Sequence, residues 1–154
     1  MRRRQPPVAW LFTDPRTDAG LFTAVERLPR GSGIVLRHHE LPKAERAALA
    51  QRLARAARRR GLLLVDEQDP RIAKAHGRAE LVAARRRGAA LVFVSPVFAS
   101  QSHPGARSLG VVRFGLLVRG AGVPVAALGG MTATRFRRLR ALGASAWGGI
   151  DAWA

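Results

Sequence analysis

The chain has 154 residues, no cysteine and 47% hydrophobic residues. This length fits one domain over residues 1–154, but it is short for a complete eight-stranded (β/α) barrel, which takes about 250 residues. The composition excludes compositional disorder, and the lack of cysteine excludes disulfides, thiolate metal sites and a cysteine nucleophile. We therefore expect a folded cytoplasmic protein. No segment approaches the roughly 18 apolar residues of a membrane span, so no membrane partner is expected.

The net charge of +17 indicates anionic partners or a solvated basic surface. Only Lys43 and Lys74 among the 27 basic residues are lysines, and this arginine bias favours the solvated surface. The other readings are phosphorylated small molecules and nucleic acid. Single-strand binders interleave aromatic and basic residues, whereas the Phe and Trp residues here lie mostly in apolar runs. Nucleic acid is therefore the least favoured partner.

Short apolar runs alternate with longer helical patterns, which is typical of β-α units around a parallel sheet. The predicted strands are Val8–Thr13, Gly33–Arg37, Leu62–Asp66, Ala89–Ser95, Val123–Leu128 and Ala144–Ile150. The predicted helices span about Asp18–Leu28, Pro42–Arg60, Gly77–Arg87, Leu109–Gly120 and Thr132–Leu142, with Thr132 as an N-cap and Gly61 and Gly143 as C-terminal glycines. The pattern predicts the α/β class, with about six β-α units.

The loop after the fourth predicted strand is rich in phosphate-binding side-chain types. Ligands of parallel α/β folds bind at the carboxyl ends of the strands. Here Ser100, Ser102 and His103 bring two hydroxyl groups and an imidazole to such an end. Hydroxyl and imidazolium groups donate to phosphate oxygens, and histidine can also act as an acid or base. An ordinary polar surface turn is the alternative reading of this loop.

Two further strand ends carry glycines. Gly129 and Gly130 lie between a strand and a helix start, where backbone N–H groups can approach an anion closely. Gly148 and Gly149 precede Ile150 and Asp151 at the end of the last strand. Each turn alone can be a tight connection, but together they match the recurring phosphate site after the last two strands of a barrel.

Four segments in this order and spacing resemble thiamine phosphate synthase and its thiazole tautomerase relatives. They are Ser95–Ala106, Leu109–Phe114, Pro124–Met131 and Gly143–Trp153. The resemblance is strong from His76 to Trp153 and fainter from Val8 to Pro70. It implies a TIM-type (β/α) barrel and a transferase of thiamine biosynthesis. Members of the family join a pyrimidine methyl diphosphate to a thiazole phosphate and release diphosphate, with Mg²⁺ on the diphosphate.

The resemblance assigns roles to residues in the second half of the chain. Ser100, Ser102 and His103 occupy a Thr-x-Thr-Lys pattern that holds the substrate phosphates, and histidine in place of lysine makes this charge depend on pH. Gly129 and Gly130 match the glycine pair that binds the thiazole phosphate. Ile150 and Asp151 match an Ile-Ser pair, and here the carboxylate of Asp151 repels a phosphate that the backbone N–H groups could still bind.

The first half matches less completely. Arg37 matches an arginine that could hold the diphosphate bidentately, although Val35 and His39 replace its polar neighbours and an arginine that merely ends a strand is the alternative. Asp66 matches a magnesium ligand, but Val65 replaces the preceding Asn. The adjacent pair His38 and His39 does not predict a metal site, because neighbouring strand residues point to opposite faces.

A segment of the family is missing after Pro70. Before His76 the family has a further β-α unit, the next strand and a second magnesium-binding carboxylate, whereas this chain has only Arg71–Ala75. Barrel closure depends on strand number. We therefore expect an incomplete barrel, open or distorted, or one completed by strands of a second chain in a homo-oligomer.

Three functions remain open at this level. The first is a thiamine phosphate synthase-like enzyme that uses Arg37 and His103 in catalysis. The second is a non-catalytic or tautomerase-like binder of thiazole or thiamine phosphates that has lost part of the magnesium site, which Val65, Asp151 and the missing segment favour. The third, a basic nucleic-acid binder, requires an affinity that falls steeply with salt.

Overall fold

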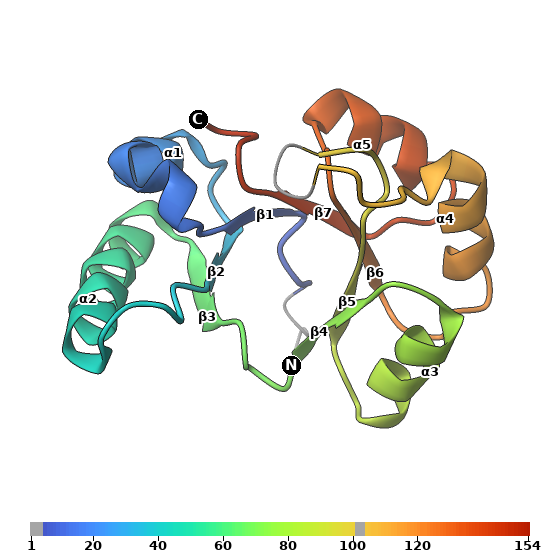
Figure 1. Ribbon diagram of the computed structural model, residues 1–154, viewed down its shortest axis with the longest axis horizontal. Coiled ribbons are helices and arrows are strands. Elements are labelled where there is room, and N and C mark those ends of the chain that lie inside the picture. Colours follow the sequence, from blue (N-terminus) through green and yellow to red (C-terminus); the bar gives the residue numbers. More distant parts are fainter. Residues whose placement is uncertain (1–4, 101–103) are drawn as a thin grey trace. The chain divides into compact units, whose positions relative to one another are not determined.

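The computed structural model describes residues 5–100 and 104–154, in which strands alternate with helices (Figure 1). The strands are β1 (Ala9–Phe12), β2 (Gly33–Leu36), β3 (Leu63–Asp66), β4 (Ile72–Ala75), β5 (Leu91–Val94), β6 (Val125–Leu128) and β7 (Ala146–Gly149). The helices are the 3-10 helix η1 (Pro15–Gly20) and the α-helices α1 (Leu21–Arg27), α2 (Lys43–Arg60), α3 (Arg78–Arg86), α4 (Gly110–Val118) and α5 (Ala133–Arg140). Neighbouring strands pair in parallel within each part of the chain. The predicted α/β class is confirmed.

The chain divides into two compact units. The first unit comprises Met1–Glu67 and Ile150–Ala154, and the second unit comprises Gln68–Gly149. The single domain predicted over residues 1–154 stays a prediction. None of the helices in the described ranges combines the length and the apolar character that crossing a membrane requires.

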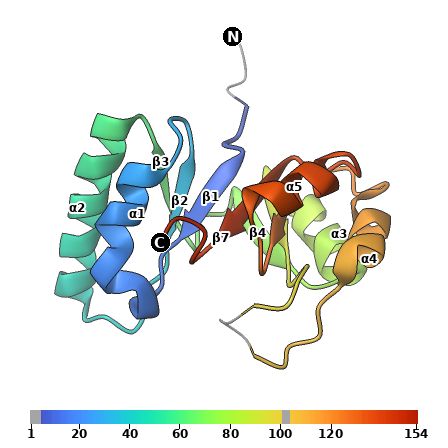
Figure 2. The same ribbon diagram turned by 90° about the horizontal axis from the view of Figure 1, so that it is seen from above.

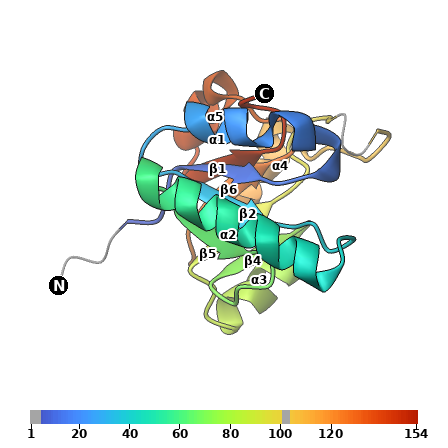
Figure 3. The same ribbon diagram turned by 90° about the vertical axis from the view of Figure 1, so that its left-hand side faces the viewer.

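The first unit contains a parallel sheet of order β3-β2-β1. Helices α1 and α2 contact each other and lie side by side on one face of this sheet (Figures 2 and 3). β1 and β2 are buried along their whole length, as expected for parallel strands that are covered on both faces. The Trp10 ring lies so close to Gly33 that a Cβ atom there would come within 2.1 Å of it. Only glycine fits at this position, because the indole ring occupies the space of a side chain.

The second unit contains a parallel sheet of order β7-β6-β5-β4. Helix α3 contacts β4 and β5, and α5 contacts β7. The core of the unit is formed by fully buried side chains of the strands and helices, among them Leu81, Leu91, Phe93, Phe114 and Leu139. Each strand ends in a loop that carries residues predicted to bind phosphate or to start a helix.

β4 is a strand that the sequence pattern did not indicate. The sequence predicts six strands, but Ile72–Ala75 forms a seventh within the described residues and pairs with β5. Of its four residues only Ala75 is buried, whereas Lys74 is exposed. β4 ends the strand order of the sheet, so it needs no continuous apolar run, and its sequence therefore lacks the signal of a buried strand.

Helix ends follow the predicted capping residues, with one difference. The Thr132 side chain accepts a hydrogen bond from the Arg135 backbone N–H and caps α5, and Gly61 adopts the left-handed conformation after α2. The helix predicted over Asp18–Leu28 is instead split into η1 and α1. Asp14 caps η1 through the Arg16 backbone N–H, and Pro15 opens it, so the chain turns earlier than the apolar periodicity indicated.

Candidate functional site

Arg37 follows β2 and lies between two carboxylates. Its Nη1 is 3.5 Å from Oδ2 of Asp14, and its Nε is 3.7 Å from Oε1 of Glu67. These distances are long for charge-assisted hydrogen bonds, which cluster near 2.7–2.9 Å. The side chain keeps 27% of its surface exposed. Arg37 is thus loosely held at a strand end, in the place where the sequence predicted an anion-binding arginine.

Asp14 is buried and fully engaged by arginines. Burial acts to raise the pKa of its carboxyl group, but hydrogen bonds from the Arg16 backbone and side chain, with the charges of Arg16 and Arg37, outweigh burial. The result is a pKa below the ordinary value of 3.8. The carboxylate therefore stays ionised at neutral pH and fixes the start of η1 beside Arg37.

His38 is a buried histidine that sequence reasoning set aside. Its side chain is 0% exposed, and its backbone φ is 51°, a conformation uncommon for a residue other than glycine. Its Nδ1 lies 2.8 Å from Thr13 Oγ1 and its Nε2 lies 2.7 Å from Asp18 Oδ1. Thr13 Oγ1 also accepts the Arg37 backbone N–H at 2.9 Å. A neutral imidazole with hydrogen on Nε2 satisfies every one of these groups.

The network around His38 fixes the backbone on both sides of Arg37. The hydroxyl group of Thr13 joins β1 to the end of β2, and the imidazole joins that end to η1. His39 points to a different partner, since its Nε2 lies 2.7 Å from Glu67 Oε2. The two adjacent rings thus make separate contacts, although both residues lie beyond the end of β2 and the alternation of strand side chains does not apply to them.

Asp66, the predicted magnesium ligand, ends β3 and is paired with an arginine. Its Oδ2 accepts a hydrogen bond from Arg46 Nη2 at 2.7 Å. Arg46 Nε also donates to the Arg37 carbonyl oxygen at 2.9 Å. Within residues 5–100 and 104–154, no group of three or more histidine, aspartate or glutamate side chains could hold a metal ion. Mg²⁺ prefers near-octahedral oxygen ligation, and the described side chains do not assemble it around Asp66.

The loops after β5 and β6 are joined in the second unit. The Val97 backbone N–H donates to the Leu128 carbonyl oxygen at 2.9 Å, and that of Phe98 donates to the Gly129 carbonyl oxygen at 3.1 Å. Ser100 lies half-buried at the end of the first described range. Ser102 and His103 lie outside the described residues, so their predicted phosphate contacts stay predictions.

Gly129 and Gly130 cannot be replaced without moving the loop beside them. Both have positive φ, 97° and 59°. A Cβ atom on Gly129 would lie 2.8 Å from Pro96 Cα, and one on Gly130 would lie 2.5 Å from the Ala99 carbonyl oxygen. The structure therefore contains the tight connection that the sequence analysis gave as the alternative interpretation of this turn. Glycine is required at both positions because the loop after β5 fills the space that a side chain would need.

Ile150 and Asp151 follow β7, and Asp151 is exposed. They are grouped with the first unit, whereas Gly129 and Gly130 belong to the second unit. The phosphate site that the sequence predicted from these two pairs together stays a prediction.

His76 and Glu80 join the end of β4 to α3. Glu80 Oε2 accepts the His76 backbone N–H at 2.8 Å and lies 3.0 Å from His76 Nδ1. The hydrogen bond from the His76 backbone, followed by that from its ring, lowers the pKa of Glu80 below its ordinary value. Both side chains are exposed, and the contact supports the helix start.

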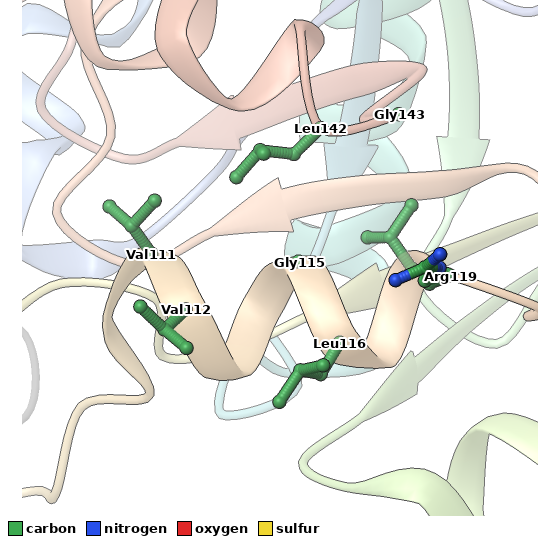
Figure 4. Close-up of a pocket in the computed structure, with 8 residues that line it drawn as sticks. Val111, Val112, Gly115, Leu116, Arg119, Leu142 and Gly143 are labelled. Carbon is green, nitrogen blue, oxygen red and sulfur yellow. The ribbon is translucent and has the colours of Figure 1, made fainter.

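A shallow apolar groove of about 700 Å³ lies along α4, away from every predicted site residue. Figure 4 shows Val111, Val112 and Leu116 on α4 and Leu142 on the turn after α5. Arg119 is the charged residue of the lining. Apart from Arg119, the lining consists of apolar side chains and glycine, so it offers no side chain for acid-base chemistry.

Comparison with known proteins relates both fold and sequence to one family. A family model described as thiamine monophosphate synthase matches residues 74–152, from within β4 to beyond β7. A thiamine phosphate pyrophosphorylase from Pyrococcus furiosus is 19% identical, with a TM-score of 0.79 over 96% of this chain and 87% of that chain. A cube-shaped protein cage designed by fusing symmetric oligomeric domains is 17% identical, with a TM-score of 0.55 over 96% of this chain and 63% of that chain. No curated protein sequence matches. The fold is that of an incomplete TIM-type barrel.

Proposed function

The chain belongs to the thiamine monophosphate synthase family, and we propose that it joins a pyrimidine methyl diphosphate to a thiazole phosphate, with release of diphosphate. The observation that carries the proposal is the family match over 74–152, which includes the glycine pair after β6. The positions of Gly129 and Gly130 between β6 and α5 support binding of the thiazole phosphate, because backbone N–H groups of glycine residues before a helix can approach phosphate oxygens.

The reaction requires charge neutralisation and positioning rather than a proton shuttle. The bond between the pyrimidine methylene carbon and the diphosphate oxygen breaks, and diphosphate leaves with the electron pair. The lone pair of the thiazole nitrogen then forms the new C–N bond, which yields the thiazolium product without loss of a proton. The protein accelerates such a step by stabilising the leaving anion and aligning the two rings.

Arg37 is the side chain that we propose for the diphosphate. A guanidinium group can donate two parallel hydrogen bonds to phosphate oxygens. Its present contacts with Asp14 and Glu67, at 3.5 and 3.7 Å, are loose enough to be exchanged for an anion. Ser100 and, by sequence, Ser102 and His103 complete the proposed phosphate contacts, with His103 as a pH-dependent cation.

Magnesium has weaker support than the phosphate contacts. The family resemblance implies Mg²⁺ at Asp66, but Asp66 is bonded to Arg46 and the described residues offer no cluster of ligands. The bond-breaking and bond-forming steps proposed above require no metal ligand from the described residues. Asp66 as its ligand remains a proposal, which a comparison of the magnesium effect in wild type and Asp66→Asn tests.

A non-catalytic or tautomerase-like binder of thiazole or thiamine phosphates is the alternative. The contact that favours it is the Arg46–Asp66 ion pair, since the guanidinium group of Arg46 binds the carboxylate that would have to coordinate the metal. The short connection between β3 and β4 points the same way, because it replaces the family's second magnesium-binding carboxylate. A homo-oligomer that completes the barrel remains a proposal, and the mass of the protein in solution tests it.

One assay separates enzyme from binder. Purified protein is incubated with the pyrimidine methyl diphosphate and the thiazole phosphate, with and without Mg²⁺. The amounts of thiamine phosphate and diphosphate that form are then measured. Equimolar formation of both products supports the enzyme. Saturable binding of thiazole phosphate by calorimetry without product supports the binder. A protein that neither forms product nor binds thiazole phosphate would contradict both proposals.

A further inference from the structure

The guanidinium group of Arg135 contacts both loops of the second unit that carry predicted phosphate-binding residues. Its Cζ lies 4.5 Å from the centroid of the Phe98 ring. Its Nη1 donates to the Gly130 carbonyl oxygen. Phe98 belongs to the loop after β5 and Gly130 to the loop after β6, so Arg135 joins the two loops. The sequence pattern did not single out this residue.

The side chain is held in place yet keeps donors for a ligand. Stacking on Phe98 covers one face of the guanidinium plane and restrains its orientation. An arginine has five N–H donors in a planar fork, and the structure assigns one of them, to Gly130. The residue is exposed at the surface. A restrained, exposed fork of this kind suits bidentate binding of phosphate oxygens.

The charge balance of the loop gives Arg135 a role. Where the family pattern has a lysine, this chain has His103, a side chain that is charged only when protonated. Arginine remains charged throughout the physiological range. We propose that Arg135 binds the phosphate group of the thiazole phosphate beside Gly130 and supplies a permanent positive charge there. This inference rests on the proposed function, because it assigns a further ligand to the same phosphate site.

The test compares two arginines of one helix. Arg135→Gln removes the charge and the fork at the loop, whereas Arg138→Gln removes the same charge from another exposed position of α5. Calorimetry measures the affinity of each variant for thiazole phosphate and for inorganic phosphate, with circular dichroism as a check of folding. We expect Arg135→Gln to weaken binding roughly 10- to 100-fold, as for loss of charge-assisted hydrogen bonds, and Arg138→Gln less than about 2-fold.

A second variant covers the case in which Arg135→Gln fails to fold. Phe98→Leu removes the stacking platform but no charge, and we expect it to weaken binding roughly 3-fold, because the fork loses its orientation. Equal effects of the two arginine variants would overturn the proposal, because Arg135 would then act only through the net charge. No effect from either variant would also overturn it, because Arg135 would then only hold the two loops together.

The result also separates this inference from the proposed function. Binding of inorganic phosphate that depends on Arg135, without any affinity for thiazole phosphate, would retain the arginine site and refute the thiazole function. Binding of thiazole phosphate that is unchanged in Arg135→Gln would retain the thiazole function and refute the arginine site. A wild-type protein that binds neither phosphate would overturn both.

Discussion

The charged strand ends of the first unit and the glycine loop of the second unit are built on different principles. After β1, β2 and β3, every predicted functional side chain has an oppositely charged partner, such as Arg37 with Asp14 or Asp66 with Arg46. After β6, the proposed functional element is backbone shaped by Gly129 and Gly130. Backbone N–H groups are present whatever the side chains, so a glycine loop keeps its chemistry as the surrounding sequence changes. The charged strand ends of the first unit depend on the identity of each side chain, and they lie outside the residues that the family model matches.

The largest effect should come from a single methyl group in the glycine loop. Gly130→Ala places a Cβ atom 2.5 Å from the Ala99 carbonyl oxygen at a φ of +59°, so the loop must move. A displacement of about 1 Å can reduce a positioned interaction about 100-fold, and we expect a loss of this size in affinity for thiazole phosphate by calorimetry. Gly88→Ala is the control, since Gly88 has a φ of +80° but open space around it. Equal losses in both variants would assign the effect to backbone strain alone.

Loss of the Arg37 side chain should weaken binding of diphosphate at the charged strand ends and leave binding at the glycine loop unchanged. Arg37→Gln removes a bidentate donor, so we expect affinity for inorganic diphosphate to fall roughly 10- to 100-fold. Affinity for thiazole phosphate should stay within about 2-fold. Arg55→Gln, on the exposed surface of α2, is the charge-matched control. A parallel fall in thiazole phosphate affinity would show that the two ends are not independent.

The buried network behind Arg37 should contribute to stability as well as to binding. Thr13→Val keeps the shape but leaves the Arg37 backbone N–H and the His38 imidazole without the Thr13 hydroxyl group. An unsatisfied buried polar group costs about 1–3 kcal/mol, and urea unfolding should report a loss of this order. Thr23→Val on the exposed side of α1 should change stability by less than about 0.5 kcal/mol. Unchanged stability in Thr13→Val would mean that water satisfies both groups.

Acid should weaken the charged end through Asp14. Because its folded-state pKa lies below the ordinary value of 3.8, its ionised form stabilises the fold above that value, and the contribution is lost as the pH falls through the lower folded-state pKa. The free energy of unfolding should therefore decline as the pH falls below the ordinary pKa of 3.8. Asp14→Asn should have a lower stability at neutral pH and a smaller decline. An identical pH profile in the two proteins would contradict this role.

The smallest effect should come from the predicted metal ligand. Asp66 and Arg46 form a half-exposed ion pair, so Asp66→Asn should cost no more than about 1 kcal/mol of stability. Since Asp66 is already bonded, we also expect Mg²⁺ to change diphosphate affinity equally in wild type and Asp66→Asn. A magnesium effect that disappears in Asp66→Asn would instead establish Asp66 as the metal ligand.

Much of the second unit could be predicted because its signals are local. The buried strands around Phe93 and Ala126 are continuous apolar runs, and Thr132 carries its own capping signal. Arg135 could not be identified in this way, because its importance depends on Phe98, far away in the sequence. His38 was set aside for a similar reason. Its partners Thr13 and Asp18 lie 25 and 20 residues away, and no local pattern shows that all three meet.

The sequence by itself determined the α/β class, the family resemblance and the glycine pair after β6, since apolar runs and glycines act through the backbone at their own position. Only the tertiary structure decided that Ile72–Ala75 is a strand, because its pairing with β5 rather than its own hydrophobicity defines it. Tertiary structure also decided the pairing of Arg37 with Asp14 and Glu67 and of Asp66 with Arg46. Charged side chains act over a few ångströms of space, and the distance along the chain does not reveal which of them become neighbours.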